Sequence, residues 1–318
     1  MKKDGQLRRV IHDVSLAVDS GEVLGVVGES GSGKSMTARA IMRLLMRGAR
    51  VTGDIRFDGV SVSAMDARAL RRHRSRDVSM IYQDPRAHIN PVRTVGDFLV
   101  EALCATGGAS SREARDRAIE ILREVGIHDA PRRMHQYPHQ LSGGLLQRVM
   151  IATGLICGPR LLLADEPTTA LDVTTQEEVM AILDEQRVER DLAMIIITHD
   201  LDLAAAVADR LAVMYAGVIV ESAPSASLRT RALHPYTVGL LASRPSGTRV
   251  RRLATIPGRP VSAFEAGPGC VFASRCPFAE QQCHRERPVL RQLAGHDVAC
   301  HRAEELQGAI DYPVEAKA

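Results

Sequence analysis

The amino-acid sequence predicts an α/β fold in which helices cover a mostly parallel sheet. Two observations lead to this fold class. Apolar residues form short continuous runs instead of alternating with polar ones, as expected of strands that are buried on both faces. Segments with the apolar spacing of helices lie between those runs, and such alternation is typical of α/β proteins. The expected strands cover residues 23–27, 78–82, 161–164, 194–197 and 211–214.

Two of the intervening helices can be placed from their apolar spacing. Residues 118–125 carry apolar side chains at positions i, i+3, i+4 and i+7, which places them on one helix face. Gly126 follows, and glycine at this point is typical of a helix end. Residues 179–183 repeat the spacing.

The composition is that of a globular protein with at most two domains. The chain has 318 residues, of which 45% are hydrophobic and 25% charged, and this balance excludes wholesale disorder. We expect no transmembrane helix and no secretory signal, because the apolar stretches are too short for either. A net charge of +3 is too small to indicate nucleic-acid binding.

The character of the chain changes near residue 228. The excess of basic residues and four of the six cysteines lie beyond that point. We therefore expect a first domain over residues 1–228 and a C-terminal extension over residues 229–318.

A glycine-rich segment follows the first expected strand. Residues 28–35 read Gly-Glu-Ser-Gly-Ser-Gly-Lys-Ser and fit the phosphate-loop pattern G-x-x-x-x-G-K-[ST], with a helical stretch after it. Glycines let backbone N–H groups converge on phosphate oxygens, and the helix N-terminus adds partial positive charge. A glycine-rich turn without a ligand is the alternative, but the chain has only four lysines and one stands at the required position. The expected ATP contacts in this segment are Gly28, Ser30, Gly31, Ser32, Gly33, Lys34, Ser35 and Thr37.

The expected strand 161–164 is followed by two carboxylates, Asp165 and Glu166. Ligands bind at the carboxyl ends of strands in open α/β sheets, so both acids are expected at the nucleotide site. Asp165 would hold Mg²⁺, and Glu166 would polarise the attacking water as a general base. An exposed acidic turn is the alternative.

A longer set of motifs resembles the ATP-binding cassette (ABC) ATPases. Residues 141–148, Leu-Ser-Gly-Gly-Leu-Leu-Gln-Arg, resemble the LSGGQ-type signature of that family. Gln83 resembles its Q-loop residue, residues 165–166 the end of its Walker B strand, residues 169–172 its D-loop, and His199 its switch histidine. The motifs occur in family order within residues 10–225, so their combination is far more specific than any one of them.

The resemblance implies a P-loop (RecA-like) ABC cassette with an antiparallel β subdomain and an α-helical subdomain over about residues 84–158. It implies that two cassettes sandwich two ATP molecules head to tail. Mg²⁺ would be held by Ser35, Gln83 and Asp165, and the catalytic residues would be Glu166, His199 and Gln83. The residues that would reach the partner's ATP are Ser142, Gly143, Gly144 and Asp172. For His199, a purely structural role is the alternative.

The sequence departs from the family's pattern near the N-terminus. Residues 1–33 contain no Phe, Tyr or Trp, whereas ABC cassettes usually have an aromatic residue there that stacks on adenine. Arg8 or Arg9 would stack through its guanidinium plane instead, unless the partner supplies the contact. The first strand of the antiparallel subdomain is expected to be short or absent. The signature also carries Leu145 and Leu146 where other residues are commoner.

The tail resembles one branch of the family. Residues 233–241, Leu-His-Pro-Tyr-Thr-Val-Gly-Leu-Leu, resemble the HPYT-x-GLL stretch of oligopeptide/dipeptide ABC importers, and residues 84–91 resemble a second stretch of that branch. Four cysteines, spaced C-x5-C-x6-C-x16-C, resemble its C-terminal motif. They are Cys270, Cys276, Cys283 and Cys300.

Three interpretations of the cysteines remain open. Disulfides do not suit a reducing cytosol. Zinc sites favour C-x2–4-C pairs, which this tail lacks. Four thiolates with wider gaps suit a [4Fe–4S] cluster, with which this branch is associated, so we expect that cluster, with zinc and unmetallated cysteines as the alternatives. The neighbouring His284, His296 and His301 are expected at the surface.

The sequence therefore predicts the ATP-hydrolysing subunit of an ABC importer for di- or oligopeptides or similar small solutes. The resemblance implies a peripheral position on the cytoplasmic face of the cell (inner) membrane. The implied partners are a second and different ATPase subunit, two transmembrane permease subunits and an extracellular or periplasmic binding protein, without nucleic acid. The alternatives are import of nickel chelates, opines or glutathione, a non-transport ABC ATPase of DNA repair or translation, and an iron–sulfur sensor with vestigial ATPase activity.

Overall fold

The structure, a computed structural model, describes residues 2–3, 6–105, 110–169, 171–243 and 255–310. Its centre is an eight-stranded mixed sheet with the strand order β11-β12-β10-β9-β3-β8-β7-β6. The strands are β3 (Val23–Val27), β6 (Val78–Ile81), β7 (Leu161–Asp165), β8 (Ala193–Thr198), β9 (Arg210–Tyr215), β10 (Val218–Pro224), β11 (Arg291–Leu293) and β12 (His296–Val298).

The five strands expected from the sequence form the parallel part of this sheet, from β9 through β3, β8 and β7 to β6. Their observed ends differ from the expected ends by one residue at most. Successive side chains of β3 enter different core clusters: Val23 and Val27 join one, and Leu24 and Val26 join the other. Burial on both faces is the reason that these strands read as continuous apolar runs.

Both helices placed from apolar spacing are present. Helix α5 (Ser111–Glu124) begins with a capping box between Ser110 and Glu113, and its side chains Ala118, Ile121 and Leu122 are fully buried. Gly126 follows with φ +76°, a left-handed conformation that suits glycine and ends the helix. Helix α8 (Val173–Arg190) contains the second predicted segment.

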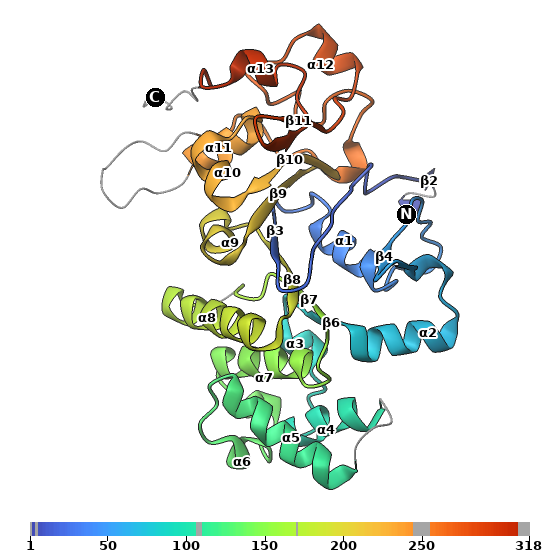
Figure 1. Cartoon of the computed structure of the whole chain (residues 1–318), viewed down its shortest axis with the longest axis vertical. Coiled ribbons are helices and arrows are strands. Elements are labelled where there is room, and N and C mark those ends of the chain that lie inside the picture. The colour runs from blue at the N-terminus through green and yellow to red at the C-terminus, as the bar shows by residue number, and fades with distance from the viewer. Residues whose placement is uncertain (1, 4–5, 106–109, 170, 244–254, 311–318) are drawn as a thin grey trace.

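A group of helices packs beside the β6 edge of the sheet, and it fills the lower part of Figure 1. Helices α4, α5 and α7 contact one another, and α7 also contacts β6. The elements of this group are α3 (Pro85–His88), α4 (Val95–Ala105), α5, α6 (Ala130–Arg133), a 3-10 turn (Pro138–Gln140) and α7 (Gly143–Leu155).

Apart from β3 and β6, the described part of the N-terminal third of the chain forms only short strands. The described residues between 8 and 22 contain no strand, and two short antiparallel pairs lie outside the main sheet. These pairs are β1 (Lys2–Lys3) with β2 (Gln6–Leu7), and β4 (Arg56–Phe57) with β5 (Val60–Ser61). The remaining helical elements of this region are α1 (Lys34–Ile41), a 3-10 turn (Val62–Ala64), α2 (Ala67–Arg72) and a π turn (His73–Asp77).

The C-terminal extension continues the main sheet, because β12 pairs antiparallel with β10 and β11 pairs with β12. Tyr215 on β9 packs against Tyr236 and Phe272 of the extension, with ring centroids 4.6 and 5.4 Å away. All three rings are almost completely buried, so the extension shares a core with the parallel sheet. Helix α9 (Leu201–Val207) precedes β9. The helical elements that follow β10 are α10 (Ser225–Arg231), α11 (Pro235–Ala242), a 3-10 turn (Ala263–Glu265), α12 (Gln281–Arg285) and α13 (Ala303–Leu306).

Candidate functional site

The phosphate loop lies between β3 and α1, as the sequence predicts. Gly28 has φ +153°, and a Cβ there would lie 2.0 Å from the Met214 carbonyl oxygen, so only glycine fits. Gly33 caps α1 in a left-handed conformation with φ 106°. Ser30 and Gly31 are exposed at the tip of the loop, where a ligand can reach their backbone N–H groups.

Lys34 and Ser35 open α1 and already have protein partners. Lys34 is buried, and its Nζ donates to the carbonyl oxygens of Gly28 at 2.7 Å and of Glu29 at 3.0 Å. Burial lowers the pKa of Lys34, and the nearby carboxylate charges oppose that shift. The Thr37 hydroxyl donates back to the Gly33 carbonyl oxygen at 3.2 Å, within the first turn of α1.

Ser32 is the unusual residue of this loop. Its side chain is 2% exposed, and its hydroxyl has no hydrogen-bond partner within the described part of the chain. A buried hydroxyl without a partner costs about 1–3 kcal/mol. A phosphate oxygen held by the loop would supply the missing bond.

The two acids at the end of β7 take different positions. Ser35 Oγ donates to Asp165 Oδ1 at 2.8 Å, which brings together two of the three expected Mg²⁺ ligands. Asp165 is buried, and burial raises its pKa despite this hydrogen bond. Glu166 adopts φ +48°, so the backbone turns sharply between the two carboxylates.

Glu166 is where the remaining catalytic candidates meet. Its Oε2 accepts from Gln83 Nε2 at 3.0 Å and from Thr169 Oγ1 at 2.8 Å, and His199 Nδ1 lies 3.5 Å away. Gln83, Glu166 and His199 follow β6, β7 and β8, which are neighbours in the parallel sheet. The carboxyl ends of these strands therefore bring the three residues together.

The signature and D-loop residues lie at two other helix starts. Ser142 caps α7 by accepting from Leu145 N, and Asp172 caps α8 by accepting from Thr175 N. A Cβ on Gly144 would lie 3.0 Å from Thr175 Cγ2, so the two helix starts are adjacent. Ser142, Gly143 and Asp172 are exposed, and α7 lies apart from α1 in Figure 1.

Four cysteines gather in the extension, and none of the described cysteines is paired in a disulfide. The backbone N–H of Cys270 donates to the Cys283 carbonyl oxygen at 2.7 Å. Burial raises the pKa of Cys276 to about 12 and that of Cys300 to about 11, and neighbouring cysteines add to both shifts. Among the described residues, no group of three or more His, Cys, Asp or Glu is arranged to hold a single metal ion.

One expectation about the nearby histidines is wrong. His296 is 1% exposed, because its Nδ1 lies 2.7 Å from Glu221 Oε1 and its Nε2 lies 2.7 Å from Ser227 Oγ. The sequence could not indicate this burial, since both partners belong to other elements. His284 is exposed, as expected.

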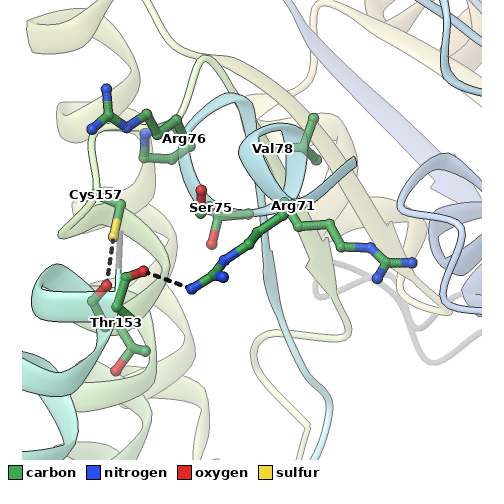
Figure 2. Close-up of a pocket in the computed structure, with 11 residues that line it drawn as sticks. Arg71, Ser75, Arg76, Val78, Thr153 and Cys157 are labelled. Atoms are coloured by element: carbon green, nitrogen blue, oxygen red, sulfur yellow. Dashed lines mark hydrogen bonds between the residues drawn. The ribbon is translucent and has the colours of Figure 1, made fainter. Parts of the chain in front are cut away.

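A cavity of about 280 Å³ lies away from these motifs, between the π turn, β6, α4 and α7. Arg71, Arg74 and Arg76 are among the residues that line it, and Figure 2 labels two of them. Arg71 donates to the Ala105 carbonyl oxygen at 3.2 Å, and Cys157 Sγ lies 3.8 Å from the Ala102 carbonyl oxygen. None of the expected ATP contacts lines this cavity.

The fold and the site together define a P-loop nucleotide-binding protein. Comparison with known proteins narrows the class. Residues 11–169 match the family model described as "ABC transporter", and residues 220–283 match the model described as "Oligopeptide/dipeptide transporter, C-terminal region".

Two relatives are similar over almost the whole chain. The "Putative peptide import ATP-binding protein" of Brucella melitensis is 45% identical over 311 residues, which cover 93% of this chain and 92% of that protein. The "Probable peptide ABC transporter ATP-binding protein" of Sinorhizobium fredii is 45% identical over 303 residues, which cover 94% and 90% of the two chains.

Two solved structures of ABC transporter proteins have a similar fold. The dimeric bacterial ABC transporter cassette MJ0796 has a TM-score of 0.64 at 28% identity, covering 71% of this chain and 94% of that chain. The protein cbiO1 of Clostridium perfringens, part of the transporter complex cbiONQ, has a TM-score of 0.60 at 26% identity, covering 69% and 83%. The chain belongs to the ATP-binding subunits of ABC transporters, in the oligopeptide/dipeptide group. In its described part, no helix has the length and hydropathy needed to cross a bilayer.

Proposed function

We propose that this chain binds and hydrolyses MgATP to drive uptake of peptides or similar small solutes by an ABC importer. The convergence of Gln83 and His199 on Glu166, next to the Ser35–Asp165 pair, is the observation that carries the proposal. The names of the relatives support peptides as the cargo.

The phosphate loop would hold the triphosphate. Lys34 would exchange the carbonyl oxygens of Gly28 and Glu29 for phosphate oxygens, and the Ser32 hydroxyl would gain its missing partner. Oxygen atoms from Ser35, Asp165 and Gln83 are ligands that suit Mg²⁺. The ion would neutralise charge that develops on the phosphates during transfer.

Glu166 would act on the attacking water. Contacts from Gln83, Thr169 and His199 converge on Oε2 and fix the carboxylate, which leaves Oε1 to accept the proton. General-base assistance contributes typically ~10²–10⁴-fold, so Glu166→Gln should reduce kcat by about that factor. ATP binding should persist, because Lys34 and Ser35 are unchanged. Normal turnover by Glu166→Gln in the assembled transporter would contradict the proposal.

A second cassette would complete each site. Ser142, Gly143, Gly144 and Asp172 lie at the adjacent, largely exposed starts of α7 and α8, where a partner's ATP can meet backbone N–H groups. The dimeric arrangement of the similar cassette MJ0796 supports this assembly. The heterodimer expected from the sequence remains part of the proposal.

The full assembly would include two permease subunits and a binding protein, and it would hold the chain on the cytoplasmic face of the membrane. Purification of the tagged chain from its own cells should recover two multi-spanning proteins. Recovery of DNA or ribosomes in their place would support a non-transport ATPase.

We also propose that the four cysteines of the extension hold a [4Fe–4S] cluster. What supports this is their grouping: the charges of Cys270 and Cys283 raise the pKa of Cys276 and Cys300 beyond the effect of burial. Bare thiols of this kind stay protonated, and iron would offset the charge of the thiolates. Anaerobic purification should give brown protein with about four irons per chain. Colourless protein with one zinc would support the alternative.

A further inference from the structure

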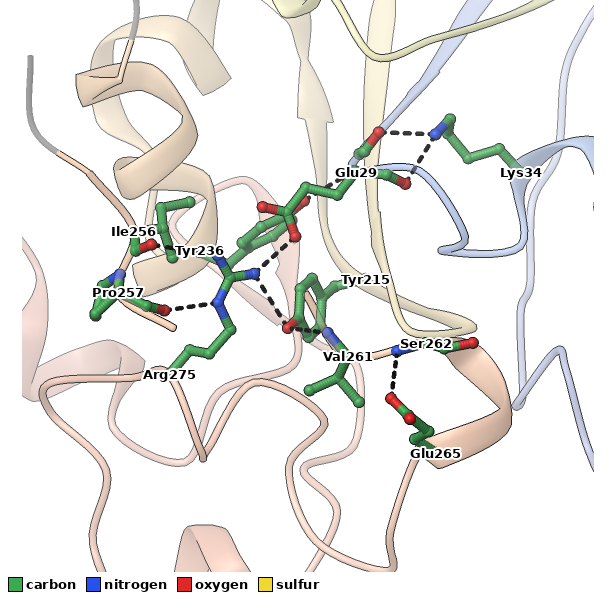
Figure 3. Close-up of polar contacts among 11 residues, drawn as sticks. Glu29, Lys34, Tyr215, Tyr236, Ile256, Pro257, Val261, Ser262, Glu265 and Arg275 are labelled. Carbon is green, nitrogen blue, oxygen red and sulfur yellow. Dashed lines mark hydrogen bonds and ion pairs between the residues drawn. The ribbon is translucent and has the colours of Figure 1, made fainter. Parts of the chain in front are cut away.

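The C-terminal extension contacts the phosphate loop at Glu29, as Figure 3 shows. The Tyr236 hydroxyl accepts a hydrogen bond from the Glu29 backbone N–H at 3.0 Å. Arg275 Nη1 donates to Glu29 Oε2 at 2.7 Å. Residue 29 of the loop is therefore held at its backbone and at its side chain by residues more than 200 positions away.

The Arg275 side chain has a fixed orientation. Its Nε donates to the Pro257 carbonyl oxygen at 2.8 Å, and its Nη1 also lies 3.3 Å from the Tyr215 hydroxyl. Only 5% of the side chain is exposed, whereas Glu29 is 24% exposed. A planar guanidinium with donors occupied on both sides cannot follow Glu29 if that residue moves.

Glu29 places a negative charge in a loop that must receive a polyanion. Its charge is among those that act on Lys34, whose Nζ also donates to the Glu29 carbonyl oxygen at 3.0 Å. Arg275 neutralises this carboxylate in a nearly buried setting. Loss of the guanidinium would leave an unpaired anion beside the phosphates, and such a charge is costly where solvent screening is weak.

We propose that Arg275, the residue before Cys276, is a positioning residue of the ATP site: it neutralises and orients Glu29 so that the phosphate loop can accept a triphosphate. The extension is thereby a working part of the nucleotide site. This inference rests on the phosphate loop as the place where ATP binds.

The test measures ATP affinity of the full-length chain by calorimetry. Arg275→Ala should weaken ATP binding about tenfold, because it exposes the phosphates to an unpaired carboxylate. Arg275→Ala combined with Glu29→Gln should recover most of that loss, since the anion is gone. The loss should also shrink from ATP to ADP to AMP as the ligand carries less charge.

A structural role alone predicts a different pattern. If Arg275 merely fastens the extension, Glu29→Gln will not rescue Arg275→Ala, and that result overturns the proposal, as does unchanged ATP affinity in Arg275→Ala. If Arg275→Ala fails to fold, the ATP affinities of Arg275→Lys and Glu29→Gln test the proposal instead. Arg275→Lys keeps the charge and should lose less than threefold in affinity, and Glu29→Gln should tighten ATP binding. The opposite outcome for either variant contradicts the inference.

Two controls complete the design. Arg302 lies on the same extension and pairs with Glu280 and Glu305, so Arg302→Ala should leave ATP affinity unchanged. Lys34→Ala should abolish ATP binding. Normal ATP binding by Lys34→Ala would refute the proposed nucleotide site itself, which separates failure of that proposal from failure of the role of Arg275.

Discussion

Replacement of Glu221 by Gln tests how the extension is attached to the sheet. Glu221 lies in β10 and is fully buried. Its Oε1 accepts from Leu233 N at 2.8 Å and lies 2.7 Å from His296 Nδ1, and its Oε2 accepts from His234 N at 3.0 Å. One carboxylate thus joins β10, the segment before α11, and β12.

The loss of stability follows from the hydrogen-bond chemistry of the two side chains. A carboxylate accepts at both oxygens, whereas a Gln side chain has one accepting oxygen and one donating NH₂ group. In Glu221→Gln the NH₂ group must face at least one N–H donor, which leaves a buried donor unsatisfied at about 1–3 kcal/mol. The surviving bonds lose their charge assistance, at roughly 1 kcal/mol more. We expect a total loss of about 3 kcal/mol.

Urea unfolding of the full-length chain, followed by circular dichroism, measures this loss as a lower transition midpoint. Glu304→Gln is the matched control, because Glu304 pairs with Arg291 at an exposed site and its substitution should leave the transition midpoint almost unchanged. A midpoint for Glu221→Gln equal to that of Glu304→Gln would refute the reasoning.

Two further predictions concern titratable groups of the extension. Burial lowers the pKa of His234 to about 4. In the unfolded chain His234 takes up a proton below about pH 6.5, whereas in the folded chain it does so only near pH 4. The contribution of His234 to the free energy of unfolding should therefore be complete above about pH 6.5. It should fall by up to about 3 kcal/mol as the pH is lowered from about 6.5 to about 4. Urea midpoints of the chain and of His234→Gln, compared across this range, check it: the variant should lack this component. Burial also raises the pKa of Cys276 and Cys300, so in metal-free protein both should react with iodoacetamide much more slowly than the exposed Cys104, as read by mass spectrometry. Equal rates at pH 8 would contradict that prediction.

The parallel sheet could be predicted from the sequence because its strands are buried on both faces. Most of them read as continuous apolar runs, as β8 does with five buried apolar residues before Thr198, although Ser79 interrupts the run of β6. The strands of the extension could not be predicted in this way. Buried Glu221 interrupts the apolar run of β10, and β12 is only three residues long and contains a buried histidine. Their polar residues are buried because they pair with each other, and such pairing has no local sequence pattern.

In the candidate site, too, local motifs could be predicted from the sequence, whereas contacts between distant residues could not. The phosphate loop is a local motif, and the positions of Gln83, Glu166 and His199 follow from neighbouring parallel strands that end at one edge. The contact between Arg275 and Glu29 joins residues 246 positions apart, and neither residue type is distinctive alone. Only the packing of the extension onto the sheet brings them together.

These contacts determine how ATP affinity depends on the extension. Lys34 donates to two loop carbonyl oxygens and Ser35 donates to Asp165, so a triphosphate with its metal must exchange these bonds instead of adding to them. Net affinity is then a small difference between bonds lost and bonds gained, and small shifts of the loop change it strongly. Glu29 connects the loop with the extension, because its carbonyl oxygen accepts from Lys34 and its carboxylate accepts from Arg275. A change that displaces Arg275 from Glu29 should therefore alter the bonds that Lys34 must give up, and with them the affinity for ATP.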